Sequence, residues 1–190
     1  MKHNIQTNVD ENITKARCSA YSLFGSGFHG HNGLDPKSLL HIYKTYITPV
    51  MLYSMELLLP SSKPLEQLEL FQKRILKQIP SLPMSCPNPA VYILTGILPK
   101  GAQIHIKALT FFNNVCHQGE KNTEKKLARR QLAVKEESSN SWFICVNKIL
   151  RKYDLDTPIK KSQWISFVKS RVNDHWCTQL TTLAQRAAIS

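Results

Sequence analysis

The spacing of apolar residues constrains this chain most, because that spacing is helical almost from end to end. Apolar side chains recur three or four residues apart in successive segments, and no run alternates between apolar and polar residues as a half-buried strand would. Prolines and glycines separate the segments. The pattern therefore predicts an all-α fold, an irregular bundle of about seven to eight helices with proline- and glycine-rich connectors.

The expected helices lie between recognisable start and stop signals. Asp35 followed by Pro36 is typical of a helix start, because the carboxylate accepts hydrogen bonds from free N–H groups and proline has no N–H to lose. A long apolar helix is expected to follow, with a kink at Pro49. The other helices are expected at about residues 11–24, 64–79, 90–95, 100–116, 120–136 and 142–153, with a last one around 165–183.

Composition divides the chain into three expected regions. Residues 1–10 are polar and are predicted to be a disordered N-terminus. Residues 11–118 are predicted to form one helical domain, and residues 119–190 a basic C-terminal helical region. The five cysteines are an odd number and contain no C-x-x-C pair, which favours reduced thiols. With no apolar leader and no membrane-spanning run, we expect a cytoplasmic or nuclear protein that is neither secreted nor transmembrane.

The stretch "GSGFHGHNGLDP", residues 25–36, raises three alternatives. A phosphate-binding loop would need a lysine and a hydroxyl residue at a helix start, and neither follows Gly30 or Gly33 in the required place. His29 and His31 have no nearby ligand cluster except Asp35, so a metal site is poorly supported. A structural connector is the favoured interpretation, because glycine permits helix stops and positive φ angles.

No catalytic centre is predicted. The carboxylate pairs Asp10 with Glu11, Glu136 with Glu137, and Asp154 with Asp156 are not flanked by the apolar strands that would hold a two-metal site. Cys116 and His117 are adjacent on a helix, so their side chains point about 100° apart, and a buried or half-buried structural cysteine is preferred to a metal ligand. We therefore expect no metal, no cofactor and no small-molecule substrate.

Positive charge is the feature that bears most on function. The formal charge is +12, from 25 Lys and Arg against 13 Asp and Glu, and the excess is greatest after residue 120. Basic helix faces can neutralise phosphates without reading bases, although an ordinary solvated surface explains such a face equally well. The candidate nucleic-acid-binding residues are Lys73, Arg74, Lys77, Lys125, Lys126, Arg129, Arg130, Lys148, Arg151 and Lys152.

Five stretches in order resemble a known family. They are "ITKARCSAYSLFGSGFHGHNGLDPKSLLHIYKTYITPVMLYSMELLLP", "LEQLELFQKRILKQIPSLP", "PAVYILTGILPKGAQIHIKALTFFNNV", "SWFICVNKILRKYDLDTP" and "QWISFVKSRVNDHW", and the resemblance as a whole covers about residues 11–185. Their order and spacing are similar to the region after the catalytic palm in reverse transcriptases of non-LTR (LINE-type) retrotransposons. The resemblance implies a helical thumb and C-terminal segment, which in that family grips the template-primer duplex by its backbone.

The family's aromatic-Ala-Asp-Asp palm motif has no counterpart in this sequence, and neither does a terminal Cys/His zinc knuckle. The resemblance therefore implies a non-catalytic fragment of an RNA-directed DNA polymerase, with a thumb-like domain over residues 11–118 and no activity on its own. RNA or DNA is the expected partner, self-association is a further possibility, and no membrane partner is expected. The alternative is a helical protein-interaction module with an exposed docking face.

Overall fold

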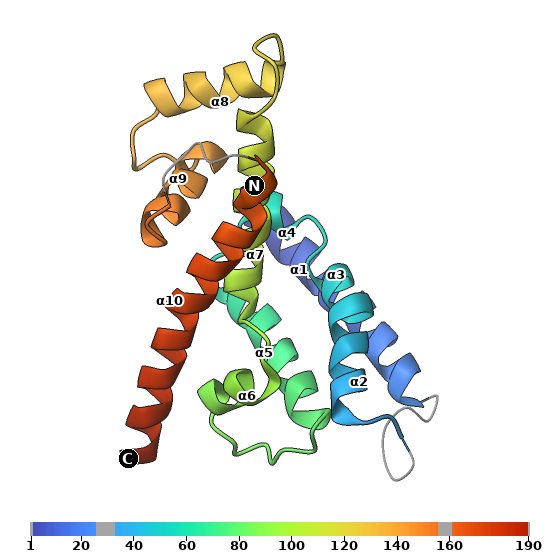
Figure 1. Ribbon diagram of the computed structural model, residues 1–190. Helices are drawn as coiled ribbons and strands as arrows, with labels where there is room; N and C mark the ends of the chain where they lie inside the picture. The colour runs from blue at the N-terminus through green and yellow to red at the C-terminus, as the bar shows by residue number, and fades with distance from the viewer. Residues whose placement is uncertain (1, 26–32, 156–160, 190) are drawn as a thin grey trace. The chain divides into compact units, whose positions relative to one another are not determined.

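The computed structural model describes residues 2–25, 33–155 and 161–189 of the 190-residue chain. Within these ranges the structure contains eight α-helices of seven residues or more and no strand, which confirms the predicted all-α fold (Figure 1). None of the helices in these ranges has the length and hydropathy that a membrane span requires. Residues 26–32, which hold most of the glycine- and histidine-rich stretch, lie outside the described residues, so the connector predicted there stays a prediction.

The chain divides into two compact units. Unit 1 consists of Met1–Met55, Pro60–Lys100 and Leu180–Ser190, and unit 2 consists of Glu56–Leu59 and Gly101–Gln179. The main division therefore lies near residue 100, whereas the sequence suggested a boundary between residues 118 and 119. The helix after Lys100 groups with the later helices because its apolar residues, such as Leu109 and Phe112, pack against them.

Helix α1 (Lys2–Leu23) opens unit 1 and starts earlier than the sequence suggested. Its buried side chains Val9, Ile13, Ala16 and Ala20 are three or four residues apart, so they form one face. Residues 2–10 belong to this helix, in contrast to the disorder predicted from their polar composition. Val9 is fully buried, and packing of this kind, rather than local propensity, supplies most of the stability of a helix in a protein.

The helix start at Asp35 is confirmed. The backbone N–H of Ser38 donates to Asp35 Oδ1 at 2.8 Å at the beginning of α2 (Pro36–Ile42). The helix then widens into a π-helical segment, η2 (Tyr43–Ile47), and continues as α3 (Thr48–Met51). This wide turn directly precedes Pro49, which has no N–H to donate, so the irregularity lies where a kink was predicted. The helix ends at Met51, and a short α4 (Met55–Leu58) follows.

The rest of unit 1 is built mainly from α5 (Lys63–Gln78) and α6 (Asn88–Thr95), which lie against each other. The spacing of apolar residues in the sequence predicts that Leu65, Leu68, Phe71, Ile75 and Leu76 form one face of α5. Four of them are buried, and Leu65, near the start of the helix, is half-buried. Gly96 ends α6 in the left-handed conformation, with φ of 59°.

Unit 2 contains most of α7 (Lys100–Cys116), all of α8 (Thr123–Val134) and α9 (Trp142–Lys152), and α10 (Lys161–Ile189) as far as Gln179. All three tryptophans of the chain lie in this unit, and each indole N–H has an acceptor. Trp142 donates to the Glu56 carbonyl at 2.9 Å, Trp164 to the Leu109 carbonyl at 3.1 Å, and Trp176 to Tyr153 Oη at 3.1 Å. These bonds satisfy polar atoms that burial would otherwise penalise.

Helix α8 is packed less than the other helices of unit 2. Ala128 is its one buried residue, and α8 contacts α9 through a small part of its surface. Leu127 is 47% exposed and Val134 is 71% exposed, although both lie on the apolar half of the helix. The basic half of α8 and part of its apolar half are therefore both open to solvent.

Candidate nucleic-acid interface

The ten predicted basic residues are all described by the structure, and they fall into two sets. Lys73, Arg74 and Lys77 lie on α5 in unit 1. The other seven lie on α8 and α9 in unit 2. Each set has to be judged by the exposure and partners of its own side chains, because a cation already held by a carboxylate contributes little to binding a phosphate.

Lys77 does not lie on an exposed basic face, in contrast to the sequence-based prediction. Its side chain is 6% exposed, and its Nζ donates to the carbonyl of Met84 at 2.7 Å. This bond ties α5 to the proline-rich connector, where backbone carbonyls lack helical partners. Lys77 is therefore a structural residue of unit 1.

The two other candidates on α5 differ from each other. Lys73 is half-buried and lines a surface hollow together with Glu66 and Glu69, so two acidic residues share its surroundings. Arg74 is exposed. Of the three candidates in unit 1, Arg74 is thus the one whose position suits contact with a phosphate.

Two basic residues of α8 are occupied by one carboxylate. Lys125 Nζ lies 2.8 Å from Glu120 Oε1, and Arg129 donates to both oxygens of the same side chain. Hydrogen bonds from Lys125 and from Arg129 hold the pKa of Glu120 below its usual value. Lys125 also donates to the carbonyl of Gln118 at 2.9 Å. Both cations therefore fasten the start of α8 to the preceding loop.

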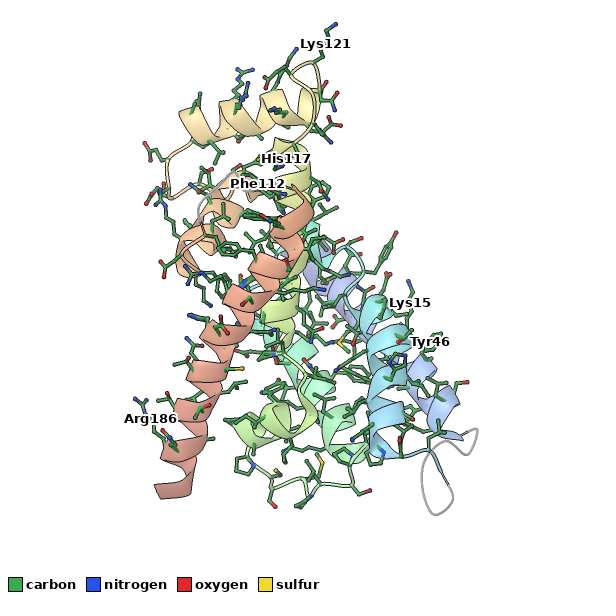
Figure 2. All side chains as sticks on the ribbon, in the orientation of Figure 1. Lys15, Tyr46, Phe112, His117, Lys121 and Arg186 are labelled. Atoms are coloured by element: carbon green, nitrogen blue, oxygen red, sulfur yellow. The ribbon has the colours of Figure 1, made fainter. Side chains whose placement is uncertain are left out.

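Lys126 and Arg130 are exposed cations of α8, as is Arg129, but they differ from Arg129 in their partners. They are four residues apart, so they lie next to each other on the helix surface. Neither makes an ion pair with another residue of the described ranges. Lys121, in the loop before α8, is also exposed and projects away from unit 2 (Figure 2). This end of unit 2 therefore presents several cations to solvent.

Arg151 of α9 pairs with Glu137, and the hydrogen bond and charge of Arg151 hold the pKa of that carboxyl below its usual value. Lys148, on the same helix, is exposed and forms no ion pair within the described part of the chain. Of the two adjacent glutamates at residues 136 and 137, Glu137 is thus an ion-pair partner of a residue of α9.

Lys152 stands over two aromatic rings. Its Nζ lies 5.3 Å from the centre of the Trp176 ring and 5.5 Å from that of Tyr153, which is within cation–π range. Lys152 as a whole residue is exposed. The rings restrict the side chain, which lowers the entropy that Lys152 would lose on holding an anion.

Sequence reasoning did not find the polar cluster beneath Lys152. His105 Nδ1 and Tyr153 Oη are 2.8 Å apart, although α7 and α9 are well separated in the chain. Burial, with a smaller contribution from the charge of Lys152, lowers the pKa of His105 to about 4. By helical spacing in the sequence, Tyr153 and Trp176 fall in apolar stripes, and no local spacing could join residues from three segments of the chain.

A surface hollow beside this cluster is lined by residues of both charges. Lys152, Arg171 and His175 face it together with Asp154 and Asp174. Arg171 donates to the carbonyl of Asp154 at 3.3 Å. The mixed charge makes this hollow a weaker anion site than the exposed cations of α8.

The cysteine and histidine at the end of α7 are structural. Cys116 is half-buried, as predicted, and burial raises the pKa of its thiol. His117 Nδ1 donates to the carbonyl of Asn113 at 2.9 Å, which engages one ring nitrogen in the helix. Across the described residues, no group of three or more His, Cys, Asp or Glu side chains is arranged to hold a metal ion. Asp156 lies outside those residues.

Comparison with known proteins assigns the chain to no family. No family model matches the sequence, no curated protein matches it, and no solved structure matches its fold.

Proposed function

We propose that this chain is a helical, non-catalytic relative of the thumb and C-terminal region of a non-LTR (LINE-type) reverse transcriptase, and that it binds RNA or DNA by the phosphate backbone. The ordered series of sequence stretches supports the family origin. The all-helical fold is compatible with a thumb, and the basic surface of unit 2 supports the binding role.

One observation carries the binding proposal. Lys126, Arg130, Lys148 and Lys152 are exposed on two helices of unit 2 and form no ion pair within the described ranges, while neighbouring cations are already paired. Cations without carboxylate partners can release the counterions that surround a nucleic acid, and this release drives binding of the backbone. Such contacts position a protein on a strand and read no sequence.

The experiment measures the anisotropy of a fluorescent RNA strand and of a DNA duplex with the full chain, over a series of salt concentrations. Each phosphate contact contributes about 0.9 to the slope of log K against log salt for B-DNA and about 0.7 for a single strand. We expect the variant K126E/R130E to reduce this slope by roughly 2 and to weaken binding of all sequences similarly.

The matched control is K37E/K44E, which changes the net charge equally at two exposed residues of unit 1. If this control and K126E/R130E weaken binding to the same extent, net charge alone explains the affinity and the assignment to α8 fails. A protein with no salt-sensitive affinity for either nucleic acid would refute the proposed function.

The absence of catalysis is part of the proposal and has its own test. Primer extension with Mg²⁺ and deoxynucleotides should yield no product from the chain alone. Incorporation that survives repurification, and that disappears when Asp10 and Glu11 or Asp154 is replaced, would contradict it.

A further inference from the structure

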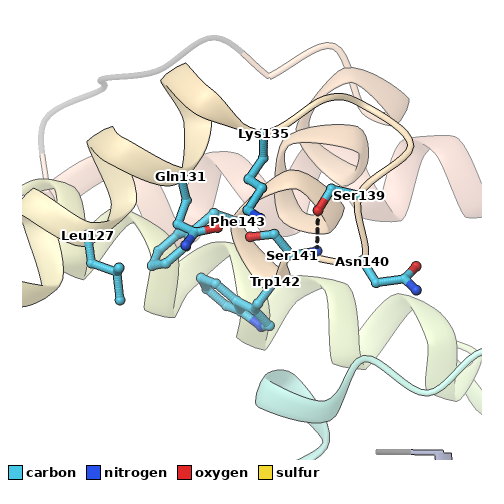
Figure 3. A pocket seen from close by; sticks show the side chains of 8 residues that line it. All are labelled: Leu127, Gln131, Lys135, Ser139, Asn140, Ser141, Trp142 and Phe143. Atoms are coloured by element: carbon cyan, nitrogen blue, oxygen red, sulfur yellow. Dashed lines mark hydrogen bonds between the residues drawn. The ribbon is translucent and has the colours of Figure 1, made fainter.

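An uncovered apolar strip on α8 meets the start of α9 in unit 2. Leu127 is one turn from Gln131 and about two turns from Val134, so the three residues share a face. Leu127, Gln131 and Lys135 face Trp142 and Phe143 across an open hollow of about 430 Å³ (Figure 3). A second hollow continues along α8 between Leu127 and Val134. Together they form a shallow groove, which we call the α8 groove.

The rings at one end of the α8 groove are firmly held. Trp142 packs edge-on against Phe143, with ring centres 5.1 Å apart, and against Phe111, with centres 5.5 Å apart. The indole N–H of Trp142 donates to the Glu56 carbonyl. These contacts fix the apolar wall in position without filling the groove. A rigid aromatic wall lowers the entropy that binding would cost.

The charged side chains that line the α8 groove have one sign. Arg130 and Lys135 line it, Lys126 is adjacent to Arg130 on the helix surface, and no Asp or Glu is among the residues that line either hollow. Leu127 and Val134 thus form an apolar strip with cations at its side and its end. A partner that covers this strip has to supply apolar side chains and negative charge together.

We propose that the α8 groove binds an acidic amphipathic helix of a partner protein. The partner would place a Leu or Phe side chain between Leu127 and Trp142, and a second apolar side chain over Val134. Glu or Asp residues beside its apolar face would then meet Arg130 and Lys135. A helix laid in a groove through anchors at i, i+4 and i+7 is a common form of peptide recognition, and complementary charge sets the orientation.

Other occupants fit the α8 groove less well. A second copy of this chain that used the same groove would bring the same cations against Arg130 and Lys135, which costs binding energy. Phosphate backbones offer no apolar group for Leu127 and Val134 to cover. A membrane surface favours a helix with a broad apolar face, whereas this strip is narrow.

The probe is a fluorescein-labelled peptide of about 16 residues, with Leu or Phe at i, i+4 and i+7 positions and Glu at most of the others. Its anisotropy is measured with the full chain at moderate salt. One control peptide has the same composition in scrambled order and therefore no apolar face. A second carries Lys in place of each Glu.

The protein variant L127S/V134S removes the apolar strip at two exposed positions, so the fold should be retained, and circular dichroism verifies this. We expect it to weaken peptide binding by about tenfold or more, while RNA binding changes little. The matched control L132S alters another exposed leucine of α8, outside both hollows, and should leave peptide binding unchanged. R130E/K135E should also weaken peptide binding.

Equal binding of the scrambled peptide would overturn the inference, because charge alone would then explain the interaction. It would also be overturned if L127S/V134S abolished a self-association measured by sedimentation, or binding to phosphatidylserine vesicles, while leaving peptide binding intact. These outcomes can be told apart from a failure of the proposed function. That function is tested by nucleic-acid binding and by the variant K126E/R130E, whereas this inference is tested by peptide binding.

Discussion

Asn12 joins two segments of unit 1 through a single buried amide. Its side chain is 6% exposed, and its Nδ2 donates to the carbonyl of Met51 at 3.3 Å and to that of Tyr53 at 2.9 Å. These carbonyls lie at and just after the end of α3, where helical acceptors lose their partners. The amide therefore completes the hydrogen bonding of a helix end from a neighbouring helix.

Replacing Asn12 with alanine should lower the free energy of unfolding by about 1–3 kcal/mol, because one buried and one part-buried carbonyl lose a donor. Urea unfolding followed by circular dichroism measures the change. The exposed Asn173 of α10 provides the control, and its replacement by alanine should alter stability by less than about 0.5 kcal/mol. Equal effects of the two substitutions would show that the bonds of Asn12 contribute nothing specific.

His105 should make the stability of unit 2 depend on pH. Its pKa is about 4 in the folded chain, below the ordinary value of 6.5, so the unfolded chain binds the proton more readily. The contribution of His105 to the free energy of unfolding is complete above pH 6.5. It falls by on the order of 3 kcal/mol as the pH drops towards 4. Lys152 and His175 both face His105 and act in the same direction.

The substitution H105F keeps a ring but removes the titrating group, so stability should fall less between pH 6.5 and 4.5 than it does for the unchanged protein. Chemical unfolding at several pH values in this window tests the prediction. H41Q, at an exposed histidine of α2, should keep the full pH dependence. An unaltered slope for H105F would mean that His105 does not titrate as its surroundings imply.

At the scale of the element, Gly96 shows how a helix end is specified. The residue has φ of 59°, and a Cβ added to it would meet no atom within 4 Å. The requirement for glycine here is therefore conformational rather than steric. In consequence, α6 stops at Thr95 and the chain turns toward α7.

We expect G96A to destabilise the protein by about 1 kcal/mol and G96N by less, because asparagine tolerates the left-handed region. Thermal unfolding compares the two variants. Gly119, which also has open space around it and no positive φ, is the control, and G119A should be neutral or slightly stabilising. A G96A protein as stable as G119A would contradict the argument.

The sequence predicted most elements of this fold because their signals are local. Asp35 with Pro36 gave the start of α2, and the bounds expected for α7 agree with those observed. The start of α1 was missed, since residues 2–10 are polar and only the packing of Val9 shows that they belong to the core.

The candidate site was less predictable than the fold. Periodicity places Lys77 and Arg74 on the same polar face of α5, yet Lys77 is buried by the connector that follows the helix. The path of that connector cannot be deduced from the helical pattern. Likewise, the pairing of Lys125 and Arg129 with Glu120 depends on how one loop turns. Exposure of a cation is a tertiary property, and charge counting along a helix cannot supply it.

The whole molecule consists of two units, and its tryptophans report on one of them. Trp142, Trp164 and Trp176 all belong to unit 2, whereas helices of both units contribute to far-ultraviolet circular dichroism. If each unit unfolds on its own, N12A should shift the dichroism transition in urea while leaving the tryptophan fluorescence transition in place. H105F should move the fluorescence transition.

Coincident fluorescence and dichroism transitions in both variants would show that the two units unfold as one cooperative body. Separate transitions would allow the contribution of each unit to stability to be measured without dividing the chain.

Two lysines of unit 1 are enclosed by the fold, which affects the chemical reactivity of the protein. Lys77 is held on the carbonyl of Met84, and Lys100 is fully buried, with its amine 3.3 Å from Thr48 Oγ1 and 5.2 Å from the centre of the Tyr43 ring. An acylating reagent such as an N-hydroxysuccinimide ester should therefore modify exposed amines such as Lys126 within minutes and leave these two intact until the protein unfolds. In mass-spectrometric footprinting, the modification of Lys77 and Lys100 should stay low both with and without RNA. These two residues would therefore serve as an internal reference for protection of Lys126 by RNA.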